Sequence, residues 1–163
     1  MNTIESDIKI LKRKLKKLPT FWDGKESILE LKEANYNWRQ MEWWAFYFEL
    51  KAKEILQKDF CFPGDKFGSV EFDLKRSINW DLKASAIKTN YHKIILNDKK
   101  AMDESLKECK YHGEIIALCD VEYNDTNRSF QKWHDELKGN KSQYVIEREE
   151  RTSMSRYRKT KAN

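Results

Sequence analysis

An acid and a lysine lie two residues apart in the stretch SINWDLKAS, at Asp81 and Lys83. Within this stretch Trp80, Leu82 and Ala84 alternate with polar residues, which predicts a half-buried β-strand. Side chains two residues apart share one face of a strand, so the carboxylate and the ammonium group are neighbours. A carboxylate can bind a divalent cation, and a nearby lysine can stabilise charge on a phosphate. The pair suits metal-assisted hydrolysis, although such alternation is also common as ordinary surface charge.

A second alternating run, SVEFDLK at residues 69–75, lies just before the first and predicts a β-hairpin. With residues 76–78 as the turn, Asp73 lies opposite Asp81 on the polar face. This register leaves the other face wholly apolar, whereas a two-residue loop would mix the two faces. Two opposed carboxylates repel each other. A divalent cation bound between them would replace this repulsion by attraction of both carboxylates to the cation.

The segments around the hairpin must position these side chains. The stretch at residues 37–58 is nearly apolar on all sides in its middle and contains no glycine or proline, which predicts a buried helix. A mostly apolar run at residues 114–123 predicts a central strand. Further helices are predicted at residues 4–17, 25–34, 98–110 and 126–139, with Gly113 breaking the third of these and Gly139 closing the last. The predicted fold class is therefore α/β (α+β), with helices around a small sheet.

The order of helix, hairpin, helix and strand between about residues 37 and 123 resembles the core of the PD-(D/E)XK nuclease superfamily, and within it the type II restriction endonucleases. Asp73 matches the first acid of that motif, and Asp81-Leu82-Lys83 matches its D-x-K. The resemblance implies a central mixed β-sheet with a β-hairpin flanked by helices, and a Mg²⁺-dependent DNA endonuclease. A glutamate of the preceding helix often joins such a site, and Glu49 is the best match, with Glu42 next.

In this resemblance Asp73, Asp81 and Glu49 are the magnesium ligands, and together with Lys83 they are the catalytic residues. Lys83 would position water and stabilise the developing charge. The chain lacks a PD dipeptide before the motif, and Asp65 in the turn PGDKFG is a rival first acid. Asp73 is preferred because it lies in register within a strand, whereas Asp65 lies in a glycine turn.

The chain of 163 residues has a net charge of +5, which favours an anionic partner. Double-stranded DNA is the partner that the resemblance implies, bound by a homodimer. Basic residues of the hairpin, of the segment after the motif and of the C-terminal segment are the predicted DNA contacts: Lys75, Lys88, Lys93, Arg151, Arg156 and Arg158. Only five glycines are present and none forms a phosphate-binding loop, which argues against a P-loop or Rossmann enzyme.

A single domain is expected over residues 1–163, with an N-terminal helical segment at 1–36, a catalytic core at 37–139 and a basic C-terminal segment at 140–163. Three cysteines without paired spacing, no signal peptide and no membrane-spanning run predict a cytoplasmic protein with no membrane partner. The chain ends just after a basic run, so either a compact full-length enzyme or a C-terminally truncated product is compatible with the sequence.

Two other functions are compatible with these patterns. One is a non-catalytic nucleic-acid-binding module on the same fold, with an incomplete site. The other is an interaction protein that docks partners through the aromatic helix at residues 37–58, which requires that helix to be exposed.

Overall fold

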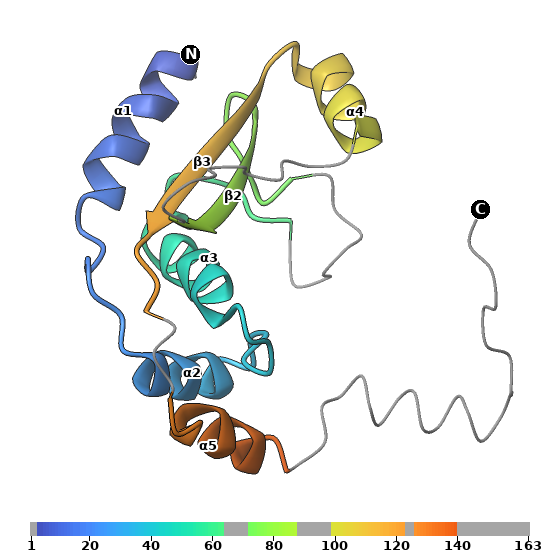
Figure 1. The fold of residues 1–163 in the computed structure, drawn as a ribbon. Helices are drawn as coiled ribbons and strands as arrows, with labels where there is room; N and C mark the ends of the chain where they lie inside the picture. The colour runs from blue at the N-terminus through green and yellow to red at the C-terminus, as the bar shows by residue number, and fades with distance from the viewer. Residues whose placement is uncertain (1–2, 64–71, 88–98, 123–125, 140–163) are drawn as a thin grey trace, which may run out of the picture. The chain divides into compact units, whose positions relative to one another are not determined.

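The computed structural model describes residues 3–63, 72–87, 99–122 and 126–139. Among them are five helices and one three-stranded mixed sheet, so the fold class is α+β (Figure 1). In chain order the elements are α1 (Ile4–Leu15), α2 (Gly24–Glu33), α3 (Trp43–Leu56), β1 (Leu74–Lys75), β2 (Asn79–Ala86), α4 (Lys99–Cys109), β3 (His112–Cys119) and α5 (Ser129–Leu137). The predicted sequence of helices, hairpin, helix, strand and helix is confirmed.

The chain forms two compact units. The first contains residues 1–38 and 42–122, and therefore every strand and the helices α1 to α4. The second contains residues 39–41 and 123–163. Within the second unit, α5 is followed by Gly139 at a positive φ of 74°, and Arg39 donates a hydrogen bond of 2.9 Å to the carbonyl oxygen of Lys138.

The hairpin has the register that the alternation predicts. Leu74 pairs with Trp80 and Lys75 pairs with Asn79, so that residues 76–78 form the turn. The register places apolar side chains together because a shift of one residue would turn every side chain to the wrong face. The described part of β1 is only two residues long, and the rest of the run at residues 69–71 lies outside the described residues.

The prediction of a central strand at residues 114–123 is wrong in two respects. The strand β3 begins earlier, at His112, and lies at one edge of the described sheet, whose order is β1-β2-β3. The central strand is β2, which pairs with β1 on one side and runs parallel to β3 on the other. Ile116 and Leu118 are 43% and 64% exposed despite their apolar character because they alternate onto the same face of β3 as His112 and Glu114.

Gly113 lies inside β3 rather than ending the preceding helix. A Cβ atom at this position would lie 2.2 Å from Cε3 of Trp80, its partner across the parallel pair. Only glycine therefore lets the indole ring lie against the backbone of β3. The helix α4 ends instead at Cys109, just before Lys110, whose φ of 64° is left-handed.

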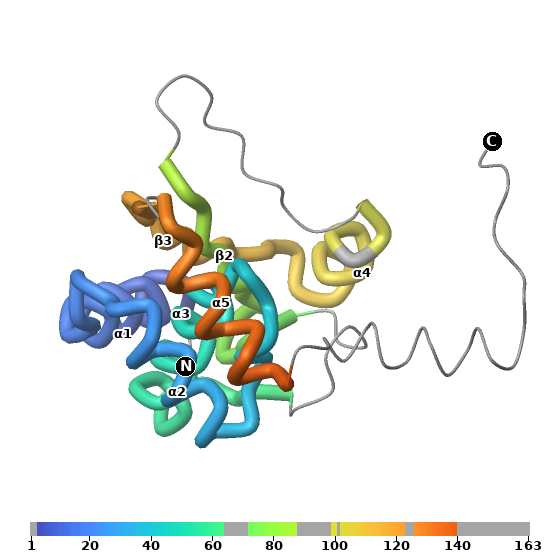
Figure 2. The backbone as a smooth tube through the Cα atoms, turned by 60° about the horizontal axis from the view of Figure 1, so that its bottom comes forward, coloured from blue at the N-terminus to red at the C-terminus, as the bar shows by residue number. Residues whose placement is uncertain are grey.

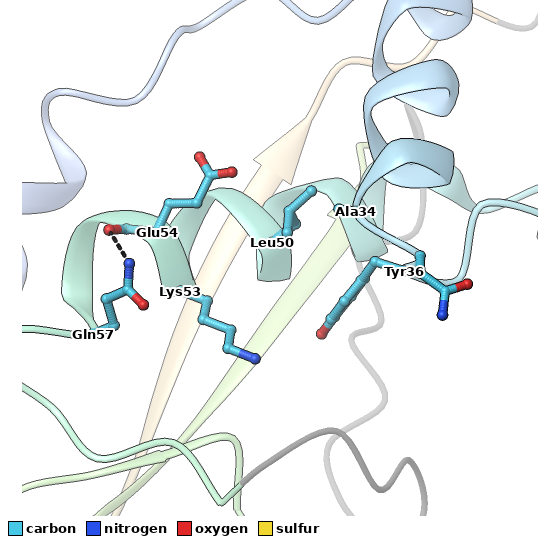
Figure 3. A pocket seen from close by; sticks show the side chains of 7 residues that line it. Ala34, Tyr36, Leu50, Lys53, Glu54 and Gln57 are labelled. Atoms are coloured by element: carbon cyan, nitrogen blue, oxygen red, sulfur yellow. Dashed lines mark hydrogen bonds between the residues drawn. The ribbon is translucent and has the colours of Figure 1, made fainter.

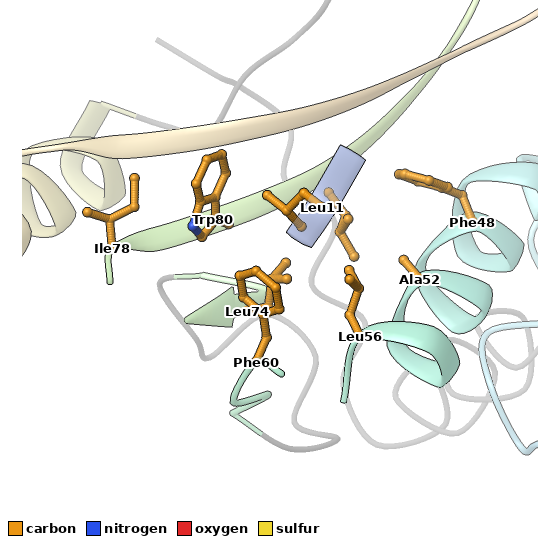
Figure 4. Packing of buried hydrophobic residues seen from close by; sticks show 9 residues of the cluster. Leu11, Phe48, Ala52, Leu56, Phe60, Leu74, Ile78 and Trp80 are labelled. Carbon is orange, nitrogen blue, oxygen red and sulfur yellow. The ribbon is translucent and has the colours of Figure 1, made fainter. Parts of the chain in front are cut away.

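The apolar face of the hairpin packs against α3. Figure 4 shows Phe48, Ala52 and Leu56 of this helix facing Leu74 of β1 and Trp80 of β2. The opposite side of α3 is also covered, because Tyr47 and Leu50 pack against Leu31 of α2. The helix is thus buried from two sides, as its continuous apolar character predicts.

This helix starts later than its sequence pattern predicts. Residues 37–42 form turns, and α3 begins at Trp43 after Glu42, whose side chain makes no capping hydrogen bond. Asn35, at a φ of 51°, ends the α2 region as a left-handed residue, as the sequence predicts for an interruption at that position. Packing against the sheet and against α2 covers these two sides of α3, which therefore are not exposed docking surfaces.

The polar face of the sheet carries α4 at one end. Asn79 of β2 donates hydrogen bonds to Ser105 Oγ and to Glu108 Oε2 of α4, each at 3.1 Å. In Figures 1 and 2, α1 and α4 lie on opposite sides of β2 and β3. The helices α1 and α3 cover the apolar face, and α4 leaves the middle of the polar face to the side chains described below. No helix in the described ranges is long and apolar enough to cross a membrane.

Candidate active site

Asp73 and Asp81 meet across the hairpin, next to the last pair of β1 and β2. The backbone N–H of Asp73 donates to Asp81 Oδ1 at 3.2 Å, and the backbone N–H of Leu82 donates to Asp73 Oδ2 at 2.7 Å. Each carboxylate thus accepts one hydrogen bond from the backbone of the opposite strand. These bonds fix the orientation of both acids and leave each with a second oxygen for another ligand.

Asp73 is held in a partly desolvated and negatively charged environment. Burial raises the pKa of its carboxyl above the ordinary value, the hydrogen bond from Leu82 lowers it, and the neighbouring charge of Asp81 raises it again. The charges of Lys83 and His112 act in the opposite direction. A carboxylate with a net raised pKa beside another acid is a group that a bound cation would stabilise.

Glu49 of α3 belongs to the same electrostatic cluster. Burial first, and then the charge of Asp73, raise the pKa of its carboxyl from 4.5 to about 7. The hydroxyl of Tyr36 donates to Glu49 Oε2 at 2.9 Å and lowers the pKa, as does the charge of Lys83, whereas Asp81 raises it. Glu49 is therefore close enough to both hairpin acids for their charges to oppose its ionisation.

Lys83 is half-buried on β2, two residues beyond Asp81. Its positive charge lowers the pKa of Glu49, of Asp73 and of Glu114. One lysine thus acts on carboxylates from α3, from the hairpin and from β3. The charges of the four residues predicted as catalytic act on one another, but the described side chains whose ligand atoms lie within 4.8 Å of one another are those of Asp81, His112 and Glu114.

The strand β3 adds two residues that sequence reasoning did not assign to the site. Glu114 pairs in register with Asp81, and the side chain of His112 is only 1% exposed. Nε2 of His112 lies 3.2 Å from Asp81 Oδ2 and 3.4 Å from Glu114 Oε1. Burial and the charge of Asp81 raise the pKa of Glu114, while the charges of Lys83 and His112 lower it.

The sequence contains no motif that would have marked His112 and Glu114. Their proximity to Asp81 depends on the parallel register between β2 and β3, and a parallel register across a long connection leaves no short-range signal. The alternation of His112 and Glu114 on one face of β3 was the only available hint, since side chains two residues apart share a face.

The ring of His112 is held from α4. Its Nδ1 lies 2.8 Å from Ser105 Oγ, and Ser105 Oγ also accepts the hydrogen bond from Asn79. Ser105, His112 and Asp81 follow one another as in a serine hydrolase triad. Ser105 is fully buried, however, and a nucleophile must reach its substrate. Its hydroxyl is placed to orient the imidazole ring.

The remaining predicted residues fall outside this cluster or outside the described ranges. Lys75 forms an ion pair with Glu108 of α4. Glu42 is exposed and precedes α3. The rival acid and most of the predicted DNA contacts lie outside the described residues: Asp65, Lys88, Lys93, Arg151, Arg156 and Arg158.

A surface pocket of about 440 Å³ lies along α3, next to the end of α2 (Figure 3). Its lining residues are Ala34, Asn35, Tyr36, Leu50, Lys53, Glu54 and Gln57. None of the predicted catalytic residues lines it. Tyr36 connects the two regions, because it lines the pocket and also donates its hydroxyl hydrogen bond to Glu49.

In comparisons with known proteins, no protein-family model, curated protein or solved structure matches this chain. The function of the candidate site is therefore inferred from its residues and their geometry.

Proposed function

We propose that this chain is a Mg²⁺-dependent DNA endonuclease with a PD-(D/E)XK-type core, acting as a type II restriction enzyme. The observation that carries the proposal is the pair of hairpin acids, Asp73 and Asp81, held opposite each other by backbone hydrogen bonds of 3.2 Å and 2.7 Å. The charges of Asp73 and Asp81 also act on Glu49, and the charge of Lys83 acts on Glu49 and Asp73. Glu49 comes from α3 and the two aspartates from the two arms of the hairpin, which supports a site shared by these elements.

The residues fit a magnesium ion chemically. Mg²⁺ prefers oxygen ligands and usually takes one or two carboxylates, with water and substrate phosphate completing its shell. Mutual repulsion and burial raise the pKa values of Glu49 and Asp73, and a divalent cation would favour their ionised forms. Asp73, Asp81 and Glu49 would hold the ion, which when bound supplies a more acidic water and neutralises charge on the phosphate.

The protein's own groups have separate roles in this proposal. The backbone hydrogen bonds from Asp73 and Leu82 fix the two hairpin carboxylates before substrate arrives. The ammonium group of Lys83 orients the attacking water and stabilises charge that develops on the scissile phosphate. The hydroxyl of Tyr36 donates a hydrogen bond to the carboxylate of Glu49 and restricts its orientation.

The order of the elements also supports the proposal. Helix α3, the hairpin β1-β2, helix α4 and the parallel strand β3 follow one another in the order that the resemblance to the superfamily implies. The D-x-K residues lie on β2, where Asp81 pairs with Glu114 and Lys83 with Ile116 of β3. This agreement supports a restriction-endonuclease-like core as the finer description of the α+β fold.

The proposed substrate is double-stranded DNA, which the net charge of +5 favours. A homodimer is proposed because a palindromic site mirrors a two-fold axis. Lys75 can contribute to DNA binding only if phosphate competes with Glu108 for its ammonium group. The described cysteines are free thiols, which is compatible with the proposed location in a reducing cytoplasm.

The test is cleavage of phage DNA by the purified protein with Mg²⁺. We expect discrete fragments from the wild type and a rate that falls by about two to three orders of magnitude in Lys83→Ala, because the main charge beside the phosphate is removed. Lys107→Ala is the matched control, since Lys107 is an exposed lysine of α4. Absence of cleavage with every divalent metal tried would remove the proposal.

Two further variants test which aspartate, Asp73 or Asp65, provides the first carboxylate of the motif. Asp73→Ala is expected to abolish cleavage, and Asp65→Ala to leave it. The reverse result would show that Asp65 provides the first carboxylate and that the hairpin acid is structural.

The alternative is a non-catalytic nucleic-acid-binding module on the same fold. It predicts DNA binding that weakens with salt and survives Asp81→Ala, with no cleavage by the wild type. The fixed orientation of the two hairpin acids favours the enzyme, because a module that only binds DNA gains nothing from opposed carboxylates.

A further inference from the structure

Three side chains from β2 and β3 point their polar atoms at one position on the polar face of the sheet. One ligand atom from each of Asp81, His112 and Glu114 lies within 4.8 Å of the other two. The side chains of Asp81 and His112 are 3% and 1% exposed, and that of Glu114 is 15% exposed. This arrangement is held by eight successive pairs between the parallel strands, rather than by a loop.

The converging atoms do not satisfy one another by hydrogen bonds. Among the described residues, Asp81 Oδ2, His112 Nε2 and both carboxylate oxygens of Glu114 are buried without a hydrogen-bond partner. Nε2 lies 3.2 Å and 3.4 Å from the two carboxylates, and its contact with Glu114 lowers the pKa of that carboxyl, but the geometry of neither contact is that of a well-formed hydrogen bond. Buried polar atoms are normally paired, so three residues that each turn one unpaired ligand atom to the same point call for a ligand.

Two of the three separations are those of ligands around a small cation, and the third lies within 4.8 Å. Ligand atoms about 2.0–2.2 Å from a tetrahedral metal lie about 3.3–3.6 Å from each other. The contacts of 3.2 Å and 3.4 Å from His112 to its two neighbours are close to this separation. An ion at their centre would replace electrostatic repulsion between Asp81 and Glu114 by attraction to both.

The second nitrogen of the ring lies within hydrogen-bond distance of Ser105, and one of the two ring tautomers makes this contact the kind that a metal ligand needs. Nδ1 of His112 lies 2.8 Å from Ser105 Oγ, whose two lone pairs can accept from His112 and from Asn79 together. In that tautomer Nδ1 carries the proton, and Nε2 presents a lone pair toward Asp81 and Glu114. Metal-binding histidines are commonly fixed through such a bond at the other nitrogen.

We propose that Asp81, His112 and Glu114 form a binding site for a divalent transition-metal ion of the Zn²⁺ and Mn²⁺ class. The imidazole nitrogen distinguishes this site from the all-oxygen cluster of Glu49 and Asp73, because nitrogen ligands favour transition metals over Mg²⁺. The site goes beyond the nuclease proposal and stands whether or not the chain cleaves DNA. Asp81 would belong to both sites, giving Oδ2 to this one and the remaining lone pair of Oδ1, beside its hydrogen bond from Asp73, to the other.

The test is calorimetric titration of the full chain with Zn²⁺, together with the visible absorption of bound Co²⁺. We expect one equivalent to bind, and His112→Ala and Glu114→Gln each to weaken binding at least tenfold. Ser105→Ala keeps all three ligands and removes only the bond that orients the ring, so a weakening of about 10–100-fold is expected. Asp103→Asn, an exposed carboxylate of α4, is the control.

Two results would overturn the proposal. One is binding that is absent from the wild type or unchanged in both ligand variants. The other is a doubly protonated ring of His112. If nuclear magnetic resonance shows both ring nitrogens protonated at pH 7.5 with Zn²⁺ present, the three residues form an ion-pair cluster and not a metal site. Asp73→Ala separates the two proposals, because it should abolish Mg²⁺-dependent cleavage and leave Zn²⁺ binding intact. The correct fold of each variant is checked by its far-ultraviolet circular dichroism.

Discussion

Asp81 uses its two carboxylate oxygens in different directions. Oδ1 accepts the backbone N–H of Asp73 on one side, and Oδ2 faces Nε2 of His112 on the other. A single side chain thus connects the hairpin acids with the residues of β3. Substituting Asp81 should therefore affect both proposed metal sites. Substituting Asp73 should affect only the magnesium site, and substituting Glu114 only the site that includes His112.

A pH-dependent stability is expected from Glu49. Burial and the charge of Asp73 raise the pKa of its carboxyl from 4.5 to about 7, so the folded protein keeps this proton after the unfolded chain has released it. The free energy of unfolding should then fall, by on the order of 3 kcal/mol, as pH rises through this window, and stay level above it. Glu49→Gln cannot ionise and should remove this decrease.

Urea denaturation at pH 5 and at pH 8 measures the effect. The stability of Glu49→Gln relative to the wild type should be higher at pH 8 than at pH 5, and Glu42→Gln, an exposed glutamate before the same helix, should show no such difference. An equal difference at both pH values would mean that the pKa of Glu49 is not raised.

Among the secondary-structure elements, α1 is bound to the turn of the hairpin by hydrogen bonds to Asp7. Asp7 of α1 is fully buried and accepts hydrogen bonds from Arg76 Nη1 at 2.7 Å, from the backbone of Ser77 at 3.0 Å and from Trp80 Nε1 at 3.2 Å. Burial pushes the pKa of Asp7 upward, but the bonds from Ser77 and Arg76 outweigh it and hold the pKa below its ordinary value. This contact orients the strand that carries Asp81.

Asp7→Ala should destabilise the protein by about 3–5 kcal/mol, because it leaves the guanidinium of Arg76 without its buried partner. Chemical denaturation compares it with Glu5→Ala, which removes an exposed carboxylate from the same helix. The contribution of Asp7 is present at neutral pH and disappears as pH falls through its lowered pKa. If Asp7→Ala destabilised the protein no more than Glu5→Ala does, the contact of Asp7 with the hairpin turn would contribute little to the free energy of unfolding.

The parallel pairing of β2 with β3 is the second decisive element contact. It brings Glu114 level with Asp81, and it is compatible only with glycine at position 113, where the ring of Trp80 lies on the backbone. The glycine that resembles a helix breaker in the sequence is thus a packing requirement. Local patterns do not distinguish these two roles because the partner strand lies more than 30 residues earlier.

At the scale of the whole molecule, the basic excess is expected to act through summed charge. The net charge is +5, and the C-terminal segment contributes Arg151, Arg156 and Arg158. Replacing these three residues by Gln should make the dependence of the DNA-binding constant on salt shallower, by about 0.9 in logarithmic slope for each phosphate that the protein no longer neutralises. Fluorescence anisotropy with a short duplex at several salt concentrations measures the slope.

The matched control removes the same charge elsewhere. Lys9, Lys12 and Lys16 are exposed on or just after α1, and their replacement by Gln lowers the net charge equally. If both triple variants change the slope by the same amount, the C-terminal segment makes no special contact with DNA.

The sequence alone determined the hairpin and its register. Alternation with period two is a local property, and only one register keeps Leu74 with Trp80 and the acids together on the other face. The helices followed from their own periodicity, and the buried character of α3 from its continuous apolar surface. The one clear error in that helix, its start, arose because nothing in residues 37–42 breaks a helix locally.

Only the tertiary structure decided what completes the site. The charge of Asp73 on Glu49, the approach of His112 to Asp81 and the pairing of Glu114 all depend on segments that are distant in the chain. Packing α3 against the hairpin and β3 beside β2 is a choice among global arrangements that bury similar apolar area. The sequence therefore named Asp73, Asp81 and Lys83 from local spacing, whereas the ligands from β3 became visible only once the strands were side by side.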